Sequence, residues 1–195
     1  MNKRVIIGVG IVVVVAAGAA VVWWLASPLF INRVVDEEFP DAAELAANPE
    51  KLMDMPEDER AEVQDEVMEA AASMPDKQAS DAMPEASGGP LVLAQGAFMD
   101  ADEFHQGSGT ATLYELDGGG HVLRFENFTV TNGPDLHVFL LQGESMDGAL
   151  DLGPLKGNVG DQNYDIPAGT DVSAFTGVSI YCVPFHVTFA TASFE

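Results

Sequence analysis

The chain has 195 residues, and its 31 aspartates and glutamates outweigh 8 lysines and arginines to give a formal net charge of −23. So negative a field repels phosphate backbones and anionic headgroups, which excludes nucleic acid as a partner. The single cysteine, Cys182, excludes an intramolecular disulfide and fits an exported protein that does not depend on disulfides.

The N-terminus predicts a membrane anchor. Lys3 and Arg4 precede an uncharged run from Val5 to Leu25, and two tryptophans end that run. A helix of roughly 20 apolar residues spans a bilayer, and tryptophan favours the membrane–water boundary. We therefore expect residues 1–33 to be a single-pass transmembrane helix in the cell membrane, with the rest of the chain outside the cytoplasm. A cleaved signal peptide is the alternative, although its apolar region is usually shorter.

Residues 34–89 are predicted to form an acidic stalk and linker. A short helix is expected from Phe39 to Asn48, where Pro49 stops it, and a better one from Pro56 to Met74. The second helix carries a narrow apolar stripe of Val63, Val67, Ala71 and Met74. Because so small a stripe buries little area, a partly ordered stalk is favoured over a docked helix. Glycines and prolines in residues 75–89 indicate a flexible linker.

From Pro90 onward, short β-rich runs alternate with turn residues. The expected strands are Leu91–Phe98, Gly109–Glu115, His121–Phe125, Thr129–Thr131, Leu136–Leu141, Asn163–Ile166, Val178–Val183 and Phe185–Ala190. This spacing predicts an all-β domain over residues 90–195, an antiparallel sandwich or barrel of about 7–10 short strands.

Cys182 lies in a stretch from Val178 to Phe189 that alternates like one strand. Side chains in a strand alternate faces, so the odd-numbered residues from Tyr181 to Phe189 are expected in the core. Cys182, Pro184 and His186 would then share the opposite, less apolar face. The thiol and one of four histidines on one face form the only arrangement in this sequence that suggests redox or metal chemistry.

Two interpretations of Cys182 remain open. It is either a small buried hydrophobe or a redox thiol. Only Arg124 and Lys156 offer positive charge in this domain, so a free thiolate is disfavoured and a metal or haem iron would have to supply that charge.

The histidines supply the candidate partners of a metal or haem at Cys182. Cys182 with His186 resembles a copper ligand pair, but four strand steps separate them by roughly 13 Å unless Pro184 bends the backbone. His137 is either a half-exposed strand residue or a further ligand. His105 and His121 are expected in loops, exposed to solvent.

Several motifs follow one another in a recognisable order. They are His121–Phe128, Thr131–Val138, Leu152–Asn158, Gly160–Pro167 and Tyr181–Phe189. In this order, residues 93–194 resemble the DM-thirteen domain, also called the electron-transfer DM domain. The resemblance implies an extracytoplasmic β-rich domain, often membrane-tethered in bacteria, whose proposed electron-transfer role rests on a cysteine that Cys182 matches.

These observations lead to one hypothesis and one alternative. The hypothesis is a membrane-tethered electron-transfer or redox domain that acts through Cys182, with haem or copper as candidate cofactors, His186 and His137 as candidate ligands, and a redox protein as the expected partner. The alternative is a cell-surface binding or adhesion module without redox chemistry. A catalyst is less favoured, because hydrolase, phosphate-loop and zinc-protease motifs are absent from the sequence.

Overall fold

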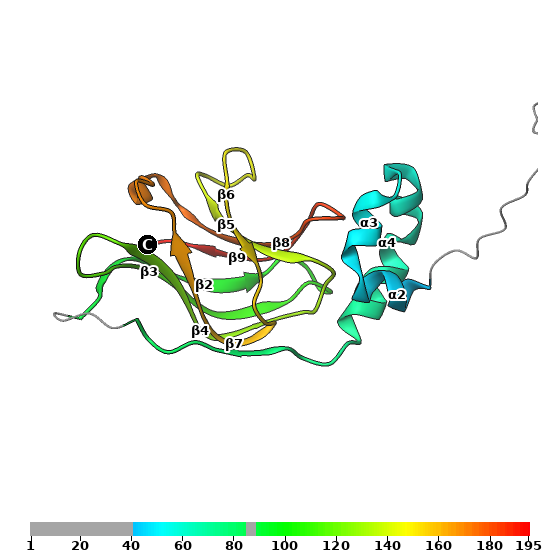
Figure 1. Ribbon diagram of the computed structural model, residues 1–195, viewed down its shortest axis with the longest axis horizontal. Coiled ribbons are helices and arrows are strands. Elements are labelled where there is room, and N and C mark those ends of the chain that lie inside the picture. Colours follow the sequence, from blue (N-terminus) through cyan, green and yellow to red (C-terminus); the bar gives the residue numbers. More distant parts are fainter. Residues whose placement is uncertain (1–40, 85–88) are drawn as a thin grey trace, which may run out of the picture. The chain divides into compact units, whose positions relative to one another are not determined.

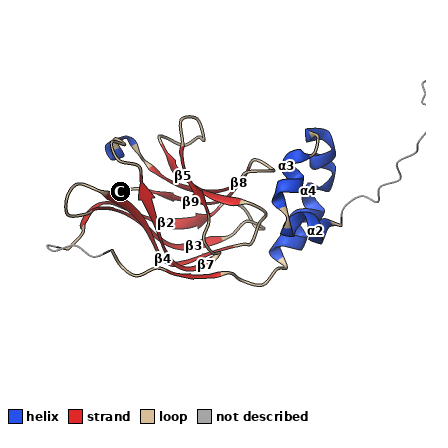
Figure 2. Ribbon diagram, in the orientation of Figure 1, coloured by secondary structure: helices blue, strands red, loops and turns tan. Residues whose placement is uncertain are grey.

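The computed structural model describes residues 41–84 and 89–195 as three short helices and a nine-stranded sheet (Figures 1 and 2). The helices are α2 (Ala42–Ala47), α3 (Pro49–Asp54) and α4 (Glu57–Ala72). The strands are β1 (Gln78–Ser80), β2 (Leu91–Asp100), β3 (Gly107–Glu115), β4 (His121–Val130), β5 (Leu136–Leu141), β6 (Leu150–Pro154), β7 (Val159–Ile166), β8 (Gly177–Cys182) and β9 (Val187–Ser193). A short 3₁₀ turn, η1 (Val172–Ala174), precedes β8.

The strand order is β1-β7-β4-β3-β2-β9-β8-β5-β6. Strand β2 joins the two halves of the sheet, because its first part pairs with β3 and its last three residues pair with β9. The mostly β architecture and the nine strands confirm the predicted β-rich domain of about 7–10 short strands. The pairing is antiparallel throughout except for β1, which runs parallel to β7.

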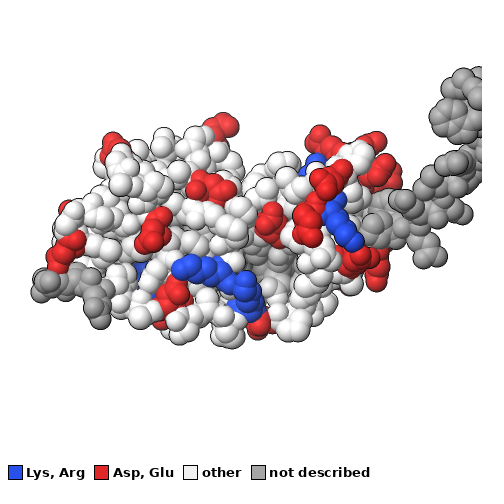
Figure 3. Space-filling model, viewed as in Figure 1, with Lys and Arg blue, Asp and Glu red and all other residues white. Residues whose placement is uncertain are grey.

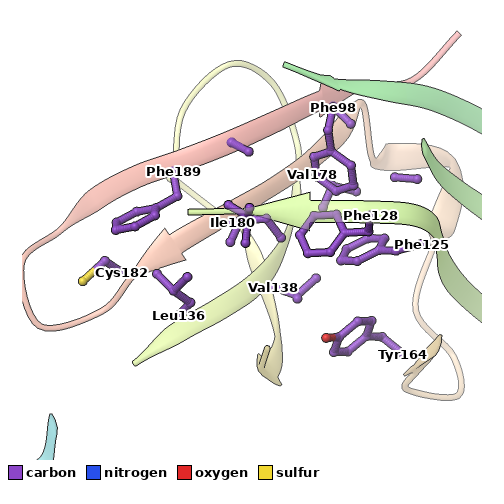
Figure 4. Close-up of a cluster of buried hydrophobic side chains, with 14 of the residues drawn as sticks. Phe98, Phe125, Phe128, Leu136, Val138, Tyr164, Val178, Ile180, Cys182 and Phe189 are labelled. Atoms are coloured by element: carbon purple, nitrogen blue, oxygen red, sulfur yellow. The ribbon is translucent and has the colours of Figure 1, made fainter. Parts of the chain in front are cut away.

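The core lies between the two halves of the sheet (Figure 4). Aromatic rings form its centre, with Phe98 of β2 packed edge-on against Phe125 of β4 at 4.9 Å between ring centroids. Val138 of β5 and Ile180 of β8 are fully buried in the same cluster. Burial of these apolar side chains is the main force that holds the two halves together.

The three helices form a small apolar cluster. Leu45 of α2, Leu52 of α3 and Val67 of α4 are each fully buried, and Met68 and Ala71 nearly so. The first helix ends before Pro49 as predicted, and Pro49 then begins α3, because proline is well tolerated at a first helical position. Figure 3 shows carboxylates scattered over the helices and strands alike, as the composition requires.

The segment after α4 takes part in the sheet. Gln78–Ser80 pairs as β1 with Val159–Asp161 of β7, so this part of the predicted flexible linker is an ordered edge strand. The predicted anchor over residues 1–33 lies outside the described residues. No helix within residues 41–84 and 89–195 is long and apolar enough to cross a membrane.

Candidate functional site

Cys182 is the last residue of β8 and points into the core. It pairs with Leu136 of β5 and is fully buried, like Val178 and Ile180 on the same side of the strand. Figure 4 shows it at one end of the cluster, beside Leu136 and Phe189. Cys182 was predicted from the sequence to lie on the less apolar face, and that prediction was wrong.

The physical reason is a turn that interrupts the predicted strand. Strand β8 ends at Cys182 and β9 begins at Val187, so residues 183–186 connect two antiparallel strands. His186 has a φ of 56°, a left-handed conformation outside the extended region that regular strands occupy. The turn breaks the predicted alternation: within it Pro184 and Phe185 are both buried and His186 is exposed, and Tyr181 before it is only partly covered.

The thiol is held as a neutral group. Its Sγ donates a hydrogen bond to the carbonyl oxygen of Pro134 at 3.1 Å. Burial raises the pKa of Cys182 to about 12. A hydrogen bond with the Phe185 backbone acts against burial, and the nearby Asp135 carboxylate adds a smaller effect in the same direction as burial. The folded chain therefore holds Cys182 as a thiol at neutral pH.

The two candidate histidine ligands lie on the other face of the sheet. His137 pairs with Tyr181, one position away from the Leu136–Cys182 pair, so its side chain points away from the thiol. Its Nδ1 lies 2.9 Å from an Asp151 carboxylate oxygen. The ring of His186 lies 6.3 Å from that of Tyr181 on the same outer side.

The residues proposed as a haem or metal site at Cys182 therefore do not converge on one point. Within residues 41–84 and 89–195, no three or more histidine, cysteine, aspartate or glutamate side chains are grouped to hold a metal ion. His137 and His186 do not fit the role of partner ligands to Cys182.

The turn at residues 131–135 covers the thiol, and its position over Cys182 was not predicted from the sequence. Residues 131–135 supply Pro134, whose carbonyl accepts from Cys182, and Asp135, whose φ is 48°. Gly133 packs against the Phe189 ring so closely that an added Cβ would lie 2.4 Å from it. The Asn-Gly-Pro-Asp sequence signals a turn, but nothing in it indicates which side chain the turn covers.

We expect the rate of alkylation of Cys182 by iodoacetamide to keep rising from about pH 7 to about pH 10, without the plateau that an ordinary thiol reaches near its pKa of about 8.5. At each pH the native chain should react far more slowly than the same chain in urea. The reason is that burial raises the pKa of the thiol to about 12. Because the fold favours the protonated form, the associated stability is full below about pH 8.5 and falls as the pH rises toward 12.

Cys182→Ser is the control for the labelling experiment, because the chain has no other cysteine and the variant should take up no label. A plateau of the native rate near pH 8.5 would contradict the buried neutral thiol.

Comparison with known proteins identifies one family. A family model described as "Electron transfer DM13" matches residues 98–194, which include Cys182 and eight of the nine strands in whole or in part. No curated protein and no solved structure matches the chain. The resemblance drawn from the sequence motifs is thereby confirmed. Through residues 98–194, the chain belongs to the electron transfer DM13 family.

Proposed function

We propose that the chain is a membrane-tethered, extracytoplasmic electron-transfer protein whose redox role passes through the thiol of Cys182. The observation that carries the proposal is the match of residues 98–194 to an electron-transfer family, within which Cys182 is the only cysteine. Its tether is the apolar run from Val5 to Leu25, and its expected partner is a redox protein.

The environment of the thiol sets a condition on this role. A fully buried thiol with a raised pKa does not exchange electrons with a partner in this conformation. Two turns cover it, residues 131–135 and residues 183–186, and the Val183 amide donates to the Asp135 carbonyl at 3.2 Å to tie them together. Electron transfer then requires these turns to separate. The thiol would then give one electron to the redox partner and its proton to water, and a thiyl radical would remain on Sγ.

A binding or adhesion module is the second candidate. Leu91, Val92 and Leu93 at the start of β2 are 60%, 51% and 38% exposed. Of strand β2, only the far end at Phe98–Asp100 pairs with β9, so the start of the strand is not paired with β9. Three consecutive exposed apolar residues suit strand-to-strand recognition better than redox chemistry.

Anaerobic reaction with ferricyanide separates the two candidates. The full chain in detergent should reduce about one equivalent of ferricyanide per thiol, and Cys182→Ser should abolish this slow reduction. Val138→Ala is the matched control, because it removes a fully buried side chain from the same core and keeps the thiol.

The outcomes point in opposite directions. Reduction that is lost in Cys182→Ser and kept in Val138→Ala supports the thiol role. Equal reduction by the wild type and Cys182→Ser, or none by either, overturns it and leaves the cysteine as a core side chain of a binding module.

A further inference from the structure

A histidine outside the predicted site is held in a fixed orientation. The Nδ1 atom of His105 lies 2.7 Å from a carboxylate oxygen of Asp102. The other oxygen of Asp102 accepts from the backbone amides of Phe104 and His105, at 2.8 and 2.7 Å. The Asp102 carboxylate is therefore an acceptor both for the ring and for the backbone of this loop. An ionised acceptor at Nδ1 places the proton of a neutral imidazole there and leaves Nε2 with a free lone pair.

That lone pair has no partner. His105 was expected to be solvent-exposed, but its side chain is only 13% exposed, and its Nε2 is one of two buried side-chain nitrogen or oxygen atoms without a hydrogen bond in the described parts of the chain. The ring packs on Phe189 at 4.3 Å and on Phe104 at 5.0 Å between centroids. A buried polar atom left unpaired costs free energy and calls for a ligand or another explanation.

A cavity of about 350 Å³ adjoins this histidine. It is lined by Phe104 and His105 on one side and by four residues of α4 on the other: Gln64, Asp65, Met68 and Glu69. Positions 65, 68 and 69 are three and four residues apart, so these side chains share one face of the helix. An imidazole, a thioether and two carboxylates therefore surround one space.

We propose that this cavity binds copper as Cu(I), with His105 Nε2 and Met68 Sδ as its ligands. Thioether sulfur selects Cu(I), and imidazole also suits copper, so copper is the metal that both donors accept. Cu(I) is satisfied by a pair of such ligands. This explains how a site can exist in residues 41–84 and 89–195 although they hold no cluster of three histidine, cysteine or carboxylate groups.

The surroundings of the pair suit a cation. Asp102 takes the place that a carboxylate commonly holds behind a metal-bound histidine, where it fixes the ring and raises its basicity. Asp65 and Glu69 add negative charge to the cavity wall, in a chain whose net charge is −23. Only 5% of the Met68 surface is exposed, so the thioether is shielded from water.

The inference goes beyond the proposed thiol role, because it places a one-electron metal at a second position that does not involve Cys182. The two can fail separately. The copper site requires His105 and Met68, whereas the thiol role requires Cys182 alone.

The test is an anaerobic titration of the full chain with Cu(I) in competition with the chromogenic chelator bicinchoninate. Wild type should take up one Cu(I) per chain, and His105→Asn and Met68→Leu should each weaken the affinity at least tenfold. Leucine keeps the apolar volume of methionine, so the helix cluster should survive, which far-UV circular dichroism checks. X-ray absorption of the loaded chain should show one nitrogen and one sulfur neighbour.

Three controls sharpen the result. Met53→Leu and His121→Asn remove the same groups outside this cavity and should leave the affinity unchanged. Cys182→Ser should also leave it unchanged. Failure of the wild type to compete for Cu(I), undiminished affinity in both cavity variants, or loss of copper in Cys182→Ser would each overturn the proposal.

Discussion

Replacing Phe125 with alanine should lower the free energy of unfolding by about 3–5 kcal/mol. Phe125 is fully buried, and its ring lies 4.9 Å from Phe98, 5.0 Å from Phe128 and 5.3 Å from Tyr164 between centroids. Because Phe98 belongs to the part of β2 that pairs with β9, the Phe125 ring joins the two halves of the sheet. Urea denaturation of the full chain, followed by far-UV circular dichroism, measures the change.

Leu91→Ala provides the comparison on the same sheet. Leu91 is 60% exposed, so its truncation should change the stability by no more than about 0.5 kcal/mol. If Phe125→Ala cost less than about 1 kcal/mol, the packing of the two halves around this ring would be refuted.

The strands that the sequence predicted well are those in which turn residues bracket an apolar run. Leu136–Leu141 was predicted with the bounds that β5 has, and Leu91–Phe98 falls within β2. Two strands were missed. β1 has three polar or small residues, and β6 contains a glycine and a proline. Both are edge strands that owe their conformation to a neighbour rather than to their own composition.

The site was predicted less well, because a two-residue period carries no information about where a strand ends. From Val178 to Phe189 the pattern looked continuous, but the turn at residues 183–186 reset it and moved Cys182 into the core. The resemblance to a family identified Cys182 as the residue of interest but did not show that its side chain is buried. His105 could not be recognised from the sequence, since its burial depends on Phe189 and on α4, both distant in the chain.

Arg124 of β4 is the second position at which a large effect is expected. Its side chain is only 5% exposed and donates to the Glu126 carboxylate at 3.1 Å and to the Asp161 carboxylate at 3.2 Å. It also donates to the Asn163 side chain at 2.9 Å and to the Asp81 carbonyl at 3.2 Å. One guanidinium therefore joins β4, β7 and the segment that follows β1.

Arg124→Ala should lower the free energy of unfolding by about 2–4 kcal/mol, because it leaves those acceptors without their donor. The value lies below that of a fully buried ion pair, since the Glu126 and Asp161 side chains are 35% and 44% exposed and water can partly replace the arginine. The backbone amides of β1 should also lose protection against hydrogen exchange. The amides that pair β8 with β9 should lose no more protection than the drop in global stability explains.

Lys51→Ala is the matched control for Arg124→Ala. Lys51 pairs with Glu44, but the two side chains are 45% and 51% exposed, so the loss should stay within about 1 kcal/mol. If Arg124→Ala behaved like Lys51→Ala in urea denaturation, the network around Asp81 would contribute nothing beyond an exposed ion pair. In that case the segment from Asp76 to Pro84 would be held to the β domain by its backbone pairing and by the hydrogen bonds that Asp76 and Asp81 make with Asn158, Lys156 and Asn163.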